Sequence, residues 1–374
     1  MRYYRSRFAS ALSLLNQYRY PEPFHIAAKN FFKLNKKYGS KDRKAISEIC
    51  YTYLRCGLTF SEMSLEEGLL LSGLLIDFDS EEYWNKQSEE LGYVYRLSEG
   101  FFDQDSSFDF IEQATGRRIE FYPSGVLMSD FEHYNYAANL KFRPRNWAKD
   151  HTDDELRNLG VTGARELAIN QTLDATTQVQ DLSSQFICSR MDINDNSRVW
   201  DVCSGAGGKS LNLSSEHRAD FYLTDVRPGI LENAKSRFNS MHYDAHYGIA
   251  DLSKPLAQLQ FKGMKVDQGY FDVIIADVPC TGSGTWFRTP EHFTRFAYDK
   301  LEKYVQRQKD IVKNAIPFLA KGGKLYYITC SVFTRENQEV REWIEENTEL
   351  KMTQEILFDG IKQKADGMYM AEFS

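Results

Sequence analysis

Four apolar residues lead into an aspartate and a cysteine in the stretch Val273-Ile274-Ile275-Ala276-Asp277-Val278-Pro279-Cys280. In a second stretch an apolar run also leads to a cysteine, which threonine precedes: Lys324-Leu325-Tyr326-Tyr327-Ile328-Thr329-Cys330-Ser331. A third stretch follows the apolar residues 199–202 with a glycine-rich turn, Cys203-Ser204-Gly205-Ala206-Gly207-Gly208-Lys209. Each apolar run has the length and composition of a core β-strand.

These runs alternate with helical patterns along the second half of the chain. A further apolar run at residues 221–224 is followed by helical spacing at residues 231–238, and another helical stretch at 301–319 precedes the second cysteine. The alternation predicts an α/β fold in which helices flank a parallel sheet. Because ligands bind at the carboxyl ends of such strands, we expect both cysteines and the glycine-rich turn at one edge of the sheet.

The first part of the chain has a different pattern. Apolar residues recur at helical spacing in residues 4–18, 24–37 and 42–55, which predicts a bundle of helices. Short alternating runs at residues 140–143 and 167–170, with a helical stretch at 153–159 between them, predict a small α/β connector. We therefore expect a helical domain (1–135), a small α/β connector (136–177) and a larger α/β domain (178–374).

Composition narrows the class of protein. The chain has 374 residues, of which 42% are hydrophobic and 26% charged, so it can bury the cores of two or three domains. The apolar residues 69–75 are too few to cross a bilayer, and arginines stand where a secretion signal needs an apolar run. We expect a cytoplasmic protein with no membrane partner. Six irregularly spaced cysteines predict reduced thiols and no metal site.

Charge is spread unevenly. The formal net charge is −7, yet Arg and Lys exceed Asp and Glu by about nine in residues 1–60, and residues 61–135 are acidic by about thirteen. The basic segment suits a nucleic-acid phosphate backbone, although ordinary solvated helix faces would have the same composition. Its cations are Arg2, Arg5, Arg7, Arg19, Lys29, Lys33, Lys36, Lys37, Lys41, Arg43 and Lys44.

The glycine-rich turn predicts a nucleotide-like cofactor. Gly205, Gly207 and Gly208 would let the backbone approach a ligand closely, and Asp225 follows the next strand, where it could accept hydrogen bonds from a ribose. Asp251 follows another strand and suits an adenine amino group. The spacing fits a dinucleotide or S-adenosylmethionine. It excludes a phosphate-binding P-loop, because Cys203 stands where that motif requires glycine.

The paired cysteines suggest nucleophilic chemistry. A cysteine at the end of a buried strand is usually a small apolar core residue, and a pair at two such ends is less expected by chance. Methylation of an unactivated pyrimidine carbon requires a thiolate to add across the ring, and a second group must then help to release the product. A nearby lysine or helix N-terminus would keep the nucleophile ionised.

On these motifs the chain resembles the RsmB/Nop/Sun family of RNA cytosine-5 methyltransferases, and the likeness spans roughly residues 138–374. The segment at residues 39–55 is similar to the NusB-like helical domain of some members, which implies RNA docking. The resemblance implies a Rossmann-like domain that binds S-adenosylmethionine. The matching segments are 180–184, 201–209, 277–285 with Arg288 and Pro290, 322–323, 329–331 with Glu336 and Asn337, and 366–371.

The resemblance also implies a role for each matching residue. Cys330 would attack carbon 6 of the cytosine, Cys280 would assist release, Asp277 would hydrogen-bond or protonate the ring nitrogen, and Lys209 would lie close to the thiols. The implied cofactor contacts are Cys203, Ser204, Gly205, Ala206, Gly207, Lys209, Asp225, Asp251 and Asp277.

Several of these residues have alternative interpretations. Asp225 and Asp251 are also typical helix caps. Arg227 and Arg288 suit contacts with RNA or cofactor, or surface salt bridges. The pair Trp286-Phe287 would stack on a flipped base or fill the core beneath the loop.

Three functions remain open. The first is methylation of RNA, with ribosomal RNA as the expected partner and transfer RNA second. A noncatalytic RNA-binding assembly factor would use the same fold as a scaffold, although the presence of Cys280, Cys330 and Lys209 favours an enzyme. A DNA or small-molecule methyltransferase of the same fold would leave Cys330 without a purpose.

Overall fold

The computed structural model describes residues 4–60, 63–76, 146–149, 163–168, 177–256 and 258–374, with a few isolated positions between residues 86 and 161. The chain divides into two compact units. One is helical and comprises residues 1–125, 135–142 and 286–296, and the other is α/β and comprises residues 126–134, 143–285 and 297–374. Across the described ranges, the helices are too short or too polar to cross a bilayer.

The helical unit follows the predicted pattern. The α-helices described within residues 4–76 are α1 (Tyr4–Gln17), α2 (Phe24–Leu34), α3 (Ser40–Arg55), α4 (Gly57–Phe60) and α5 (Leu65–Ile76). The first three confirm the helices expected from apolar spacing. In α3 the buried residues Ile46, Ile49, Cys50 and Leu54 recur every three or four positions and form one apolar face. Most of the acidic residues 61–135 lie outside the described part of the chain.

A short segment from far along the sequence, Trp286–Phe296, belongs to this helical unit. Trp286, Phe287 and Phe293 are at most 3% exposed, and both neighbouring rings pack against Phe293. The buried carboxylate of Glu291 accepts a hydrogen bond of 3.0 Å from the backbone N–H of Phe24, at the start of α2. Trp286 and Phe287 therefore fill a core and offer no exposed stacking surface.

The α/β unit is built on a seven-stranded sheet with the order β11-β12-β10-β9-β4-β5-β6. Neighbouring strands from β6 to β10 are parallel, but β12 is antiparallel to both β10 and β11. The strands from which a parallel sheet was expected are parallel neighbours, whereas β12 adds an antiparallel edge, because only a short loop joins β11 to β12 and a parallel pair would need a crossover. The strands are β4 (Arg198–Asp201), β5 (Asp220–Asp225), β6 (His246–Ile249), β9 (Phe271–Asp277), β10 (Leu319–Thr329), β11 (Met352–Phe358) and β12 (Met368–Phe373).

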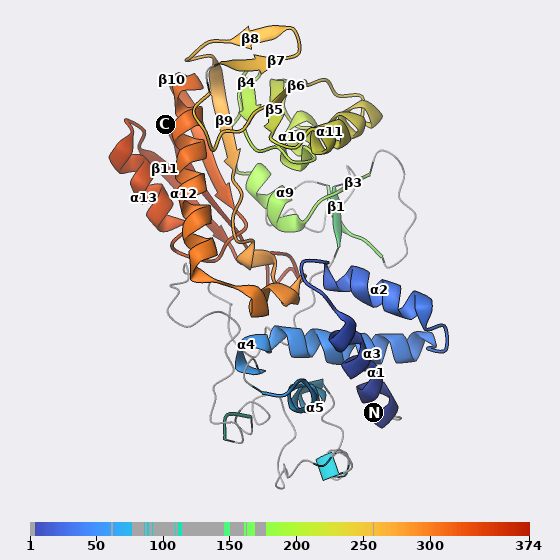
Figure 1. Ribbon diagram of the computed structural model, residues 1–374. Helices are drawn as coiled ribbons and strands as arrows, with labels where there is room; N and C mark the ends of the chain where they lie inside the picture. Colours follow the sequence, from blue (N-terminus) through green and yellow to red (C-terminus); the bar gives the residue numbers. More distant parts are fainter. Residues whose placement is uncertain are drawn as a thin grey trace. The chain divides into compact units, whose positions relative to one another are not determined.

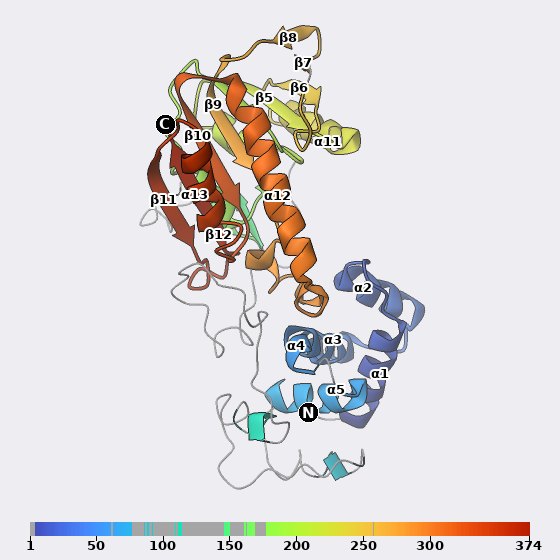
Figure 2. The same cartoon turned by 60° about the vertical axis from the view of Figure 1, so that its left-hand side comes forward.

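Helices cover both faces of the sheet (Figures 1 and 2). One face carries α9 (Leu182–Cys188), α10 (Gly208–Ser214) and α11 (Pro228–Ser240), and the other carries α12 (Tyr298–Ala315) and α13 (Gln338–Asn347). Successive strand residues alternate between the faces. Val199 and Ile275 join the core under α9, α10 and α11, whereas Trp200 contacts the ring of Phe318, which follows α12. The predicted α/β fold with a Rossmann-like sheet is confirmed.

Two smaller sheets complete the described unit. The hairpin of β7 (Leu259–Phe261) and β8 (Met264–Val266) follows β6. The connector contains β1 (Trp147–Lys149), β2 (Ala164–Glu166) and β3 (Gln178–Val179) in the order β2-β1-β3.

Two expectations about the connector need correction. A strand was expected at residues 167–170, but residues 167 and 168 follow β2 (164–166) outside any strand, and residues 169 and 170 lie outside the described residues. Three residues are too few to show an alternating pattern. The α/β domain was expected to begin at residue 178, yet β3 at that position pairs with β1 of the connector. The expected strand at 140–143 and helix at 153–159 lie outside the described residues.

Candidate active site

The glycine-rich turn joins β4 to α10 and exposes its backbone. Gly205 and Gly207 have φ angles of 54° and 72°, in the left-handed region that favours glycine. At Gly207 a Cβ would lie 3.1 Å from the ring of Phe238 and 3.2 Å from Leu223, so packing also requires glycine. A Cβ built on Gly205 would meet nothing within 4 Å. The turn therefore has room for a ligand against its backbone.

Two oxygen atoms at this turn are buried without a hydrogen-bond partner among the described residues: Asp201 Oδ1 and Ser204 Oγ. The other carboxylate oxygen of Asp201 accepts a hydrogen bond of 2.6 Å from Ser210 Oγ. Burial raises the pKa of Asp201 to about 7. Because an unsatisfied buried polar atom is costly, these oxygens are places where polar groups of a ligand would bind.

Asp225 is the last residue of β5, and Asp251 comes two residues after β6, at the same edge of the sheet. Burial opposes ionisation of Asp225, but hydrogen bonds from Arg227 outweigh it and lower the pKa of Asp225. Ser253 and Lys254 donate to Asp251, and these hydrogen bonds lower the pKa of Asp251. Arg227 thus forms a salt bridge with Asp225, as one interpretation expected. Asp225 and Asp251 bond to residues outside the described helices, so neither acts as the expected helix cap.

Cys280 and Cys330 lie side by side, with their Sγ atoms 3.3 Å apart. Their loops follow β9 and β10, which are parallel neighbours, so both loops begin at the same edge of the sheet. The hydrogen bond with Cys330 and burial raise the pKa of Cys280 well above its ordinary value. The expected meeting of the two thiols is observed.

A buried ion pair stands next to the thiols. Lys209 Nζ lies 2.5 Å from Asp277 Oδ2, and the two side chains are 9% and 32% exposed. Burial disfavours the charged lysine, but the Asp277 carboxylate outweighs it, so the pKa of Lys209 is raised. Lys209 also interacts electrostatically with Cys330.

These groups line one pocket of about 590 Å³. It contains the predicted residues Cys203, Asp225, Asp251, Asp277, Cys280 and Cys330. Ser204, Gly205, Ala206 and Gly207 continue the turn from Cys203, and Lys209 reaches the pocket through Asp277. The three pocket cysteines are half-buried, whereas Cys50, Cys56 and Cys188 are fully buried. Exposure thus separates the thiols that a ligand can reach from those that pack a core.

The sequence motifs did not indicate four further residues at this site. Tyr304 and Arg307 line the pocket from α12, on a helix whose pattern carries no recognisable motif. Gln308 and Glu336 are completely buried next to the thiol loops. Glu336 was noted only as part of a family segment. One signal in the sequence could have indicated a buried acceptor such as Glu336: a residue with a hydroxyl group, Thr281 or Ser331, follows each cysteine. Buried hydroxyl groups need a hydrogen-bond partner.

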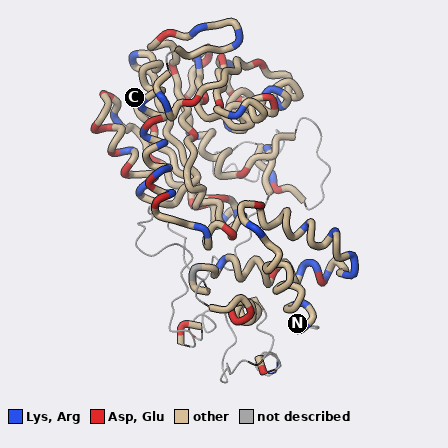
Figure 3. Tube along the Cα trace, in the orientation of Figure 1, with Lys and Arg blue, Asp and Glu red and all other residues tan. Residues whose placement is uncertain are grey.

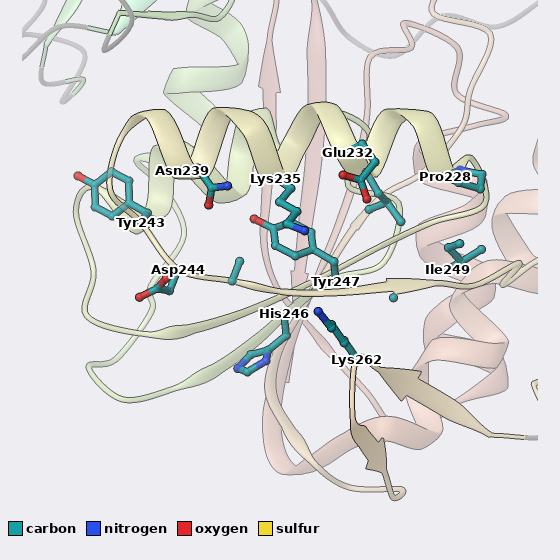
Figure 4. Close-up of a pocket in the computed structure, with 13 residues that line it drawn as sticks. Pro228, Glu232, Lys235, Asn239, Tyr243, Asp244, His246, Tyr247, Ile249 and Lys262 are labelled. Atoms are coloured by element: carbon teal, nitrogen blue, oxygen red, sulfur yellow. The ribbon is translucent and has the colours of Figure 1, made fainter.

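A second hollow of about 460 Å³ lies between α11 and β6. Figure 4 shows Lys235 and Glu232 above it on α11, with His246 and Tyr247 on β6 and Lys262 on the β7–β8 hairpin. It contains no cysteine and no part of the glycine-rich turn, so we place the candidate active site in the thiol pocket. Within the described residues, His, Cys, Asp and Glu form no cluster suited to a metal ion.

Known proteins resemble this chain in sequence and in fold. Residues 189–373 match the family described as 16S rRNA methyltransferase RsmB/F. The Ribosomal RNA small subunit methyltransferase B of Yersinia enterocolitica is 28% identical over 162 residues, which is 43% of this chain and 36% of that protein. The protein of the same name from Yersinia pseudotuberculosis is 26% identical over 178 residues, or 47% of this chain and 40% of that protein. The match thus spans well under half of each relative.

Solved structures share the fold. The crystal structure of PH0851 covers 98% of this chain and 97% of its own, with a TM-score of 0.64 and 16% identity. A methyltransferase homologue from Pyrococcus horikoshii covers 63% of this chain and 88% of its own, with a TM-score of 0.50 and 17% identity. At these identities the likeness concerns the fold alone.

Proposed function

We propose that this chain, whose C-terminal domain belongs to the RsmB/F family of methyltransferases, methylates carbon 5 of a cytosine in RNA through a covalent cysteine-cytosine intermediate. The observation that carries the proposal is the pair of thiols 3.3 Å apart beside the Lys209–Asp277 ion pair. Addition of a thiolate to the ring needs one cysteine, and release of the product gives the second a purpose.

The residues around the glycine-rich turn fit S-adenosylmethionine. The open space at Gly205 and the unpartnered oxygens of Asp201 and Ser204 leave room and hydrogen-bond acceptors for it. Asp225 would accept from the ribose hydroxyls once Arg227 turns away, and the Arg227 side chain is 63% exposed. Asp251 would accept from the adenine amino group. When bound, this cofactor supplies the methyl group.

Cys330 is the nucleophile in this proposal. Its thiolate bonds to carbon 6, and the electron pair of the 5,6 double bond makes carbon 5 nucleophilic. The Asp277 carboxylate accepts a hydrogen bond from the exocyclic amino group at the nitrogen edge of the ring, and the ammonium of Lys209, paired with Asp277, stabilises the negative charge that develops. Loss of either member of the ion pair would raise the barrier to addition.

Cys280 acts after methyl transfer. Once Cys330 is bonded to carbon 6, the hydrogen bond that raises the pKa of Cys280 is lost, and the Cys280 thiol proton passes to water. This is the proton that the overall reaction releases. The Cys280 thiolate then takes the proton from carbon 5. The electrons of that C–H bond re-form the 5,6 double bond, and Cys330 leaves carbon 6 as a thiolate. The pair again holds one proton, so the site is restored.

Ribosomal RNA is the proposed substrate, in line with the names of the family and of the relatives. The helical unit would dock RNA through exposed cations on α2, the following turn and α3. Figure 3 shows Lys and Arg gathered along this part of the unit. The seven exposed residues, called the α2–α3 cluster below, are Lys29, Lys33, Lys36, Lys37, Lys41, Arg43 and Lys44. A NusB-like fold for this unit stays a prediction.

The test is methyl transfer with labelled S-adenosylmethionine to protein-free small-subunit ribosomal RNA, assembled small subunits and transfer RNA, followed by nucleoside analysis. We expect label in 5-methylcytidine from one of the ribosomal substrates. Label confined to transfer RNA would redirect the substrate, and label in another nucleoside would refute the cytosine chemistry. Cofactor binding without transfer to any RNA would favour a noncatalytic assembly factor.

A further inference from the structure

The residue that follows each thiol donates to the same buried carboxylate oxygen. Thr281 Oγ1 and Ser331 Oγ each lie 2.5 Å from Glu336 Oε2. Thr281 is the chain neighbour of Cys280, and Ser331 is the neighbour of Cys330. Glu336 Oε2 thus links two loops that are 50 residues apart in the sequence through hydrogen bonds to both.

The other oxygen of Glu336 holds the Cys280 loop a second time. Glu336 Oε1 accepts from the backbone N–H of Thr281 at 2.8 Å and from Gln308 Nε2 at 3.0 Å. Gln308 Nε2 also donates to the carbonyl of Pro279 at 3.0 Å. The residues on both sides of Cys280 are therefore fixed, Thr281 by Glu336 directly and Pro279 by Gln308, which itself donates to Glu336. We call Glu336, Gln308, Thr281 and Ser331 the Glu336 network.

Glu336 is itself held firmly. Its side chain is completely buried, and Tyr327 Oη donates both to its backbone carbonyl at 2.6 Å and to Gln308 Oε1 at 3.1 Å. A buried carboxylate is tolerated only when donors satisfy it, and this one has four. A satisfied buried network of this kind fixes one geometry.

From these contacts we propose that Glu336 is a positioning residue that holds Cys280 beside Cys330, and that this placement sets the rate of product release. The inference rests on the two-thiol function proposed above. Formation of the adduct needs only Cys330, whereas removal of the carbon 5 proton needs Cys280 at the correct distance and angle. Loss of the network therefore slows release more than it slows addition.

The first test compares wild type, Glu336→Ala, Glu336→Gln and Cys280→Ala by the amount of RNA adduct that survives a denaturing gel. In Glu336→Ala we expect adduct to accumulate although Cys280 is intact, with turnover reduced about a hundredfold and the rate of adduct formation nearly unchanged. A purely structural role would lower addition and release together. Glu336→Gln should release product almost normally, because its amide can donate to both hydroxyls, which then accept.

Two further variants keep the result interpretable. Glu346→Ala alters an exposed carboxylate on α13 and should behave as wild type. If Glu336→Ala does not fold, Thr281→Val removes one hydroxyl of the network and keeps the side-chain shape, and we expect adduct accumulation with about tenfold slower turnover. Product release at the wild-type rate in whichever variant folds would overturn the proposal.

The rate of disulfide formation between Cys280 and Cys330 tests the positioning role of Glu336 without RNA, and so independently of the proposed function. Diamide takes two electrons and two protons from a close pair of thiols and leaves a disulfide between Cys280 and Cys330. In a background lacking Cys203, cross-linking followed by intact-protein mass should slow about tenfold in Glu336→Ala. If wild type methylates no RNA but cross-linking slows in this way, the function fails and the positioning role stands. Equal cross-linking rates would overturn the positioning role.

Discussion

Charged side chains are buried and paired at the carboxyl edge of the sheet, whereas those of the α2–α3 cluster on the helical unit are exposed to solvent. At the sheet edge, Lys209 and Asp277 form a buried pair, and Glu336 accepts four hydrogen bonds. On the helical unit, the α2–α3 cluster is exposed and none of its seven cations forms an ion pair with a described residue. A buried charge that loses its partner costs about 3–5 kcal/mol, whereas an exposed pair contributes about 1 kcal/mol or less.

The two regions should therefore respond differently to substitution. Changes at the sheet edge are expected to act on the rate of the reaction and on stability, one residue at a time. Substitutions in the α2–α3 cluster are expected to weaken RNA binding. Their effects on affinity should add together and should become smaller as the salt concentration rises.

The largest effect is expected for Cys330→Ala. Removal of a nucleophile leaves only cofactor and RNA binding, so methyl transfer should fall by at least about a thousandfold, and no adduct should form. The measurement is incorporation of labelled methyl groups. Cys56→Ala, which removes a fully buried thiol of the helical unit, is the matched control and should keep its activity. Substantial methylation by Cys330→Ala would contradict the assignment of the nucleophile.

A second effect concerns Asp201 and pH. Its pKa of about 7 in the folded protein lies above its ordinary value of 3.8, so the fold favours the protonated acid. The stabilisation is complete below about pH 4 and is lost as pH rises through 7. Asp201→Asn stays neutral, so between these limits its free energy of unfolding should gain about 4 kcal/mol relative to wild type.

Urea denaturation of both proteins at several pH values checks this expectation. A difference in unfolding free energy that stays constant from pH 4 to 7.5 would show that Asp201 is already ionised in the fold. Asp299→Asn, at an exposed position on α12, is the control for a carboxylate at the surface.

A third effect is that the two members of the Lys209–Asp277 ion pair should differ in how much their loss destabilises the fold. Asp277→Asn leaves the ammonium of Lys209 buried without its counter-charge, and should destabilise the fold by about 3 kcal/mol. Lys209→Met replaces the buried cation by an apolar chain and leaves Asp277, which is 32% exposed, within reach of water. We expect it to cost about 1 kcal/mol. Denaturation midpoints test the order, and equal costs would contradict it. Both variants should lose methyl transfer.

The smallest effect per residue is expected on the α2–α3 cluster. A triple Lys36→Ala, Lys37→Ala, Lys41→Ala variant should raise the KM for RNA several-fold without changing kcat. The slope of log affinity against log salt should become shallower by about 0.7 to 0.9 for each RNA phosphate that the variant no longer neutralises. A matched triple variant at Lys262, Lys265 and Lys321 of the α/β unit is the control. The same effect in both triples would show that only net charge matters.

The sequence predicted which residues meet at the edge of the sheet better than it predicted the elements around them. Cysteines and acidic residues at strand ends are recognisable because period-two apolar runs mark each strand and parallel strands bring their carboxyl ends together. That reasoning placed Cys280 beside Cys330 and Asp225 and Asp251 in the same pocket. The contact between Asp277 and Lys209 was not predicted, since the family resemblance implied only that Lys209 would lie close to the thiols.

Other features depend on tertiary contacts that local patterns do not report. Nothing in the run Trp286-Phe287 shows that it is buried in the helical unit, since exposed and buried aromatic residues look alike in sequence. Glu336 and Gln308 are polar residues of the kind usually found at the surface, and only the fold reveals that buried donors and acceptors surround them. Antiparallel β12 was missed because orientation depends on loop length as well as on pattern.

The central claim is that Cys330 bonds to the base and Cys280 releases it. The most direct measurement is to incubate Cys280→Ala with its RNA substrate and S-adenosylmethionine, run a denaturing gel, and map the cross-linked peptide by mass spectrometry. We predict an RNA adduct that survives denaturation and contains Cys330. Rapid turnover by Cys280→Ala without any adduct, or an adduct on a peptide that lacks Cys330, would contradict the two-thiol mechanism.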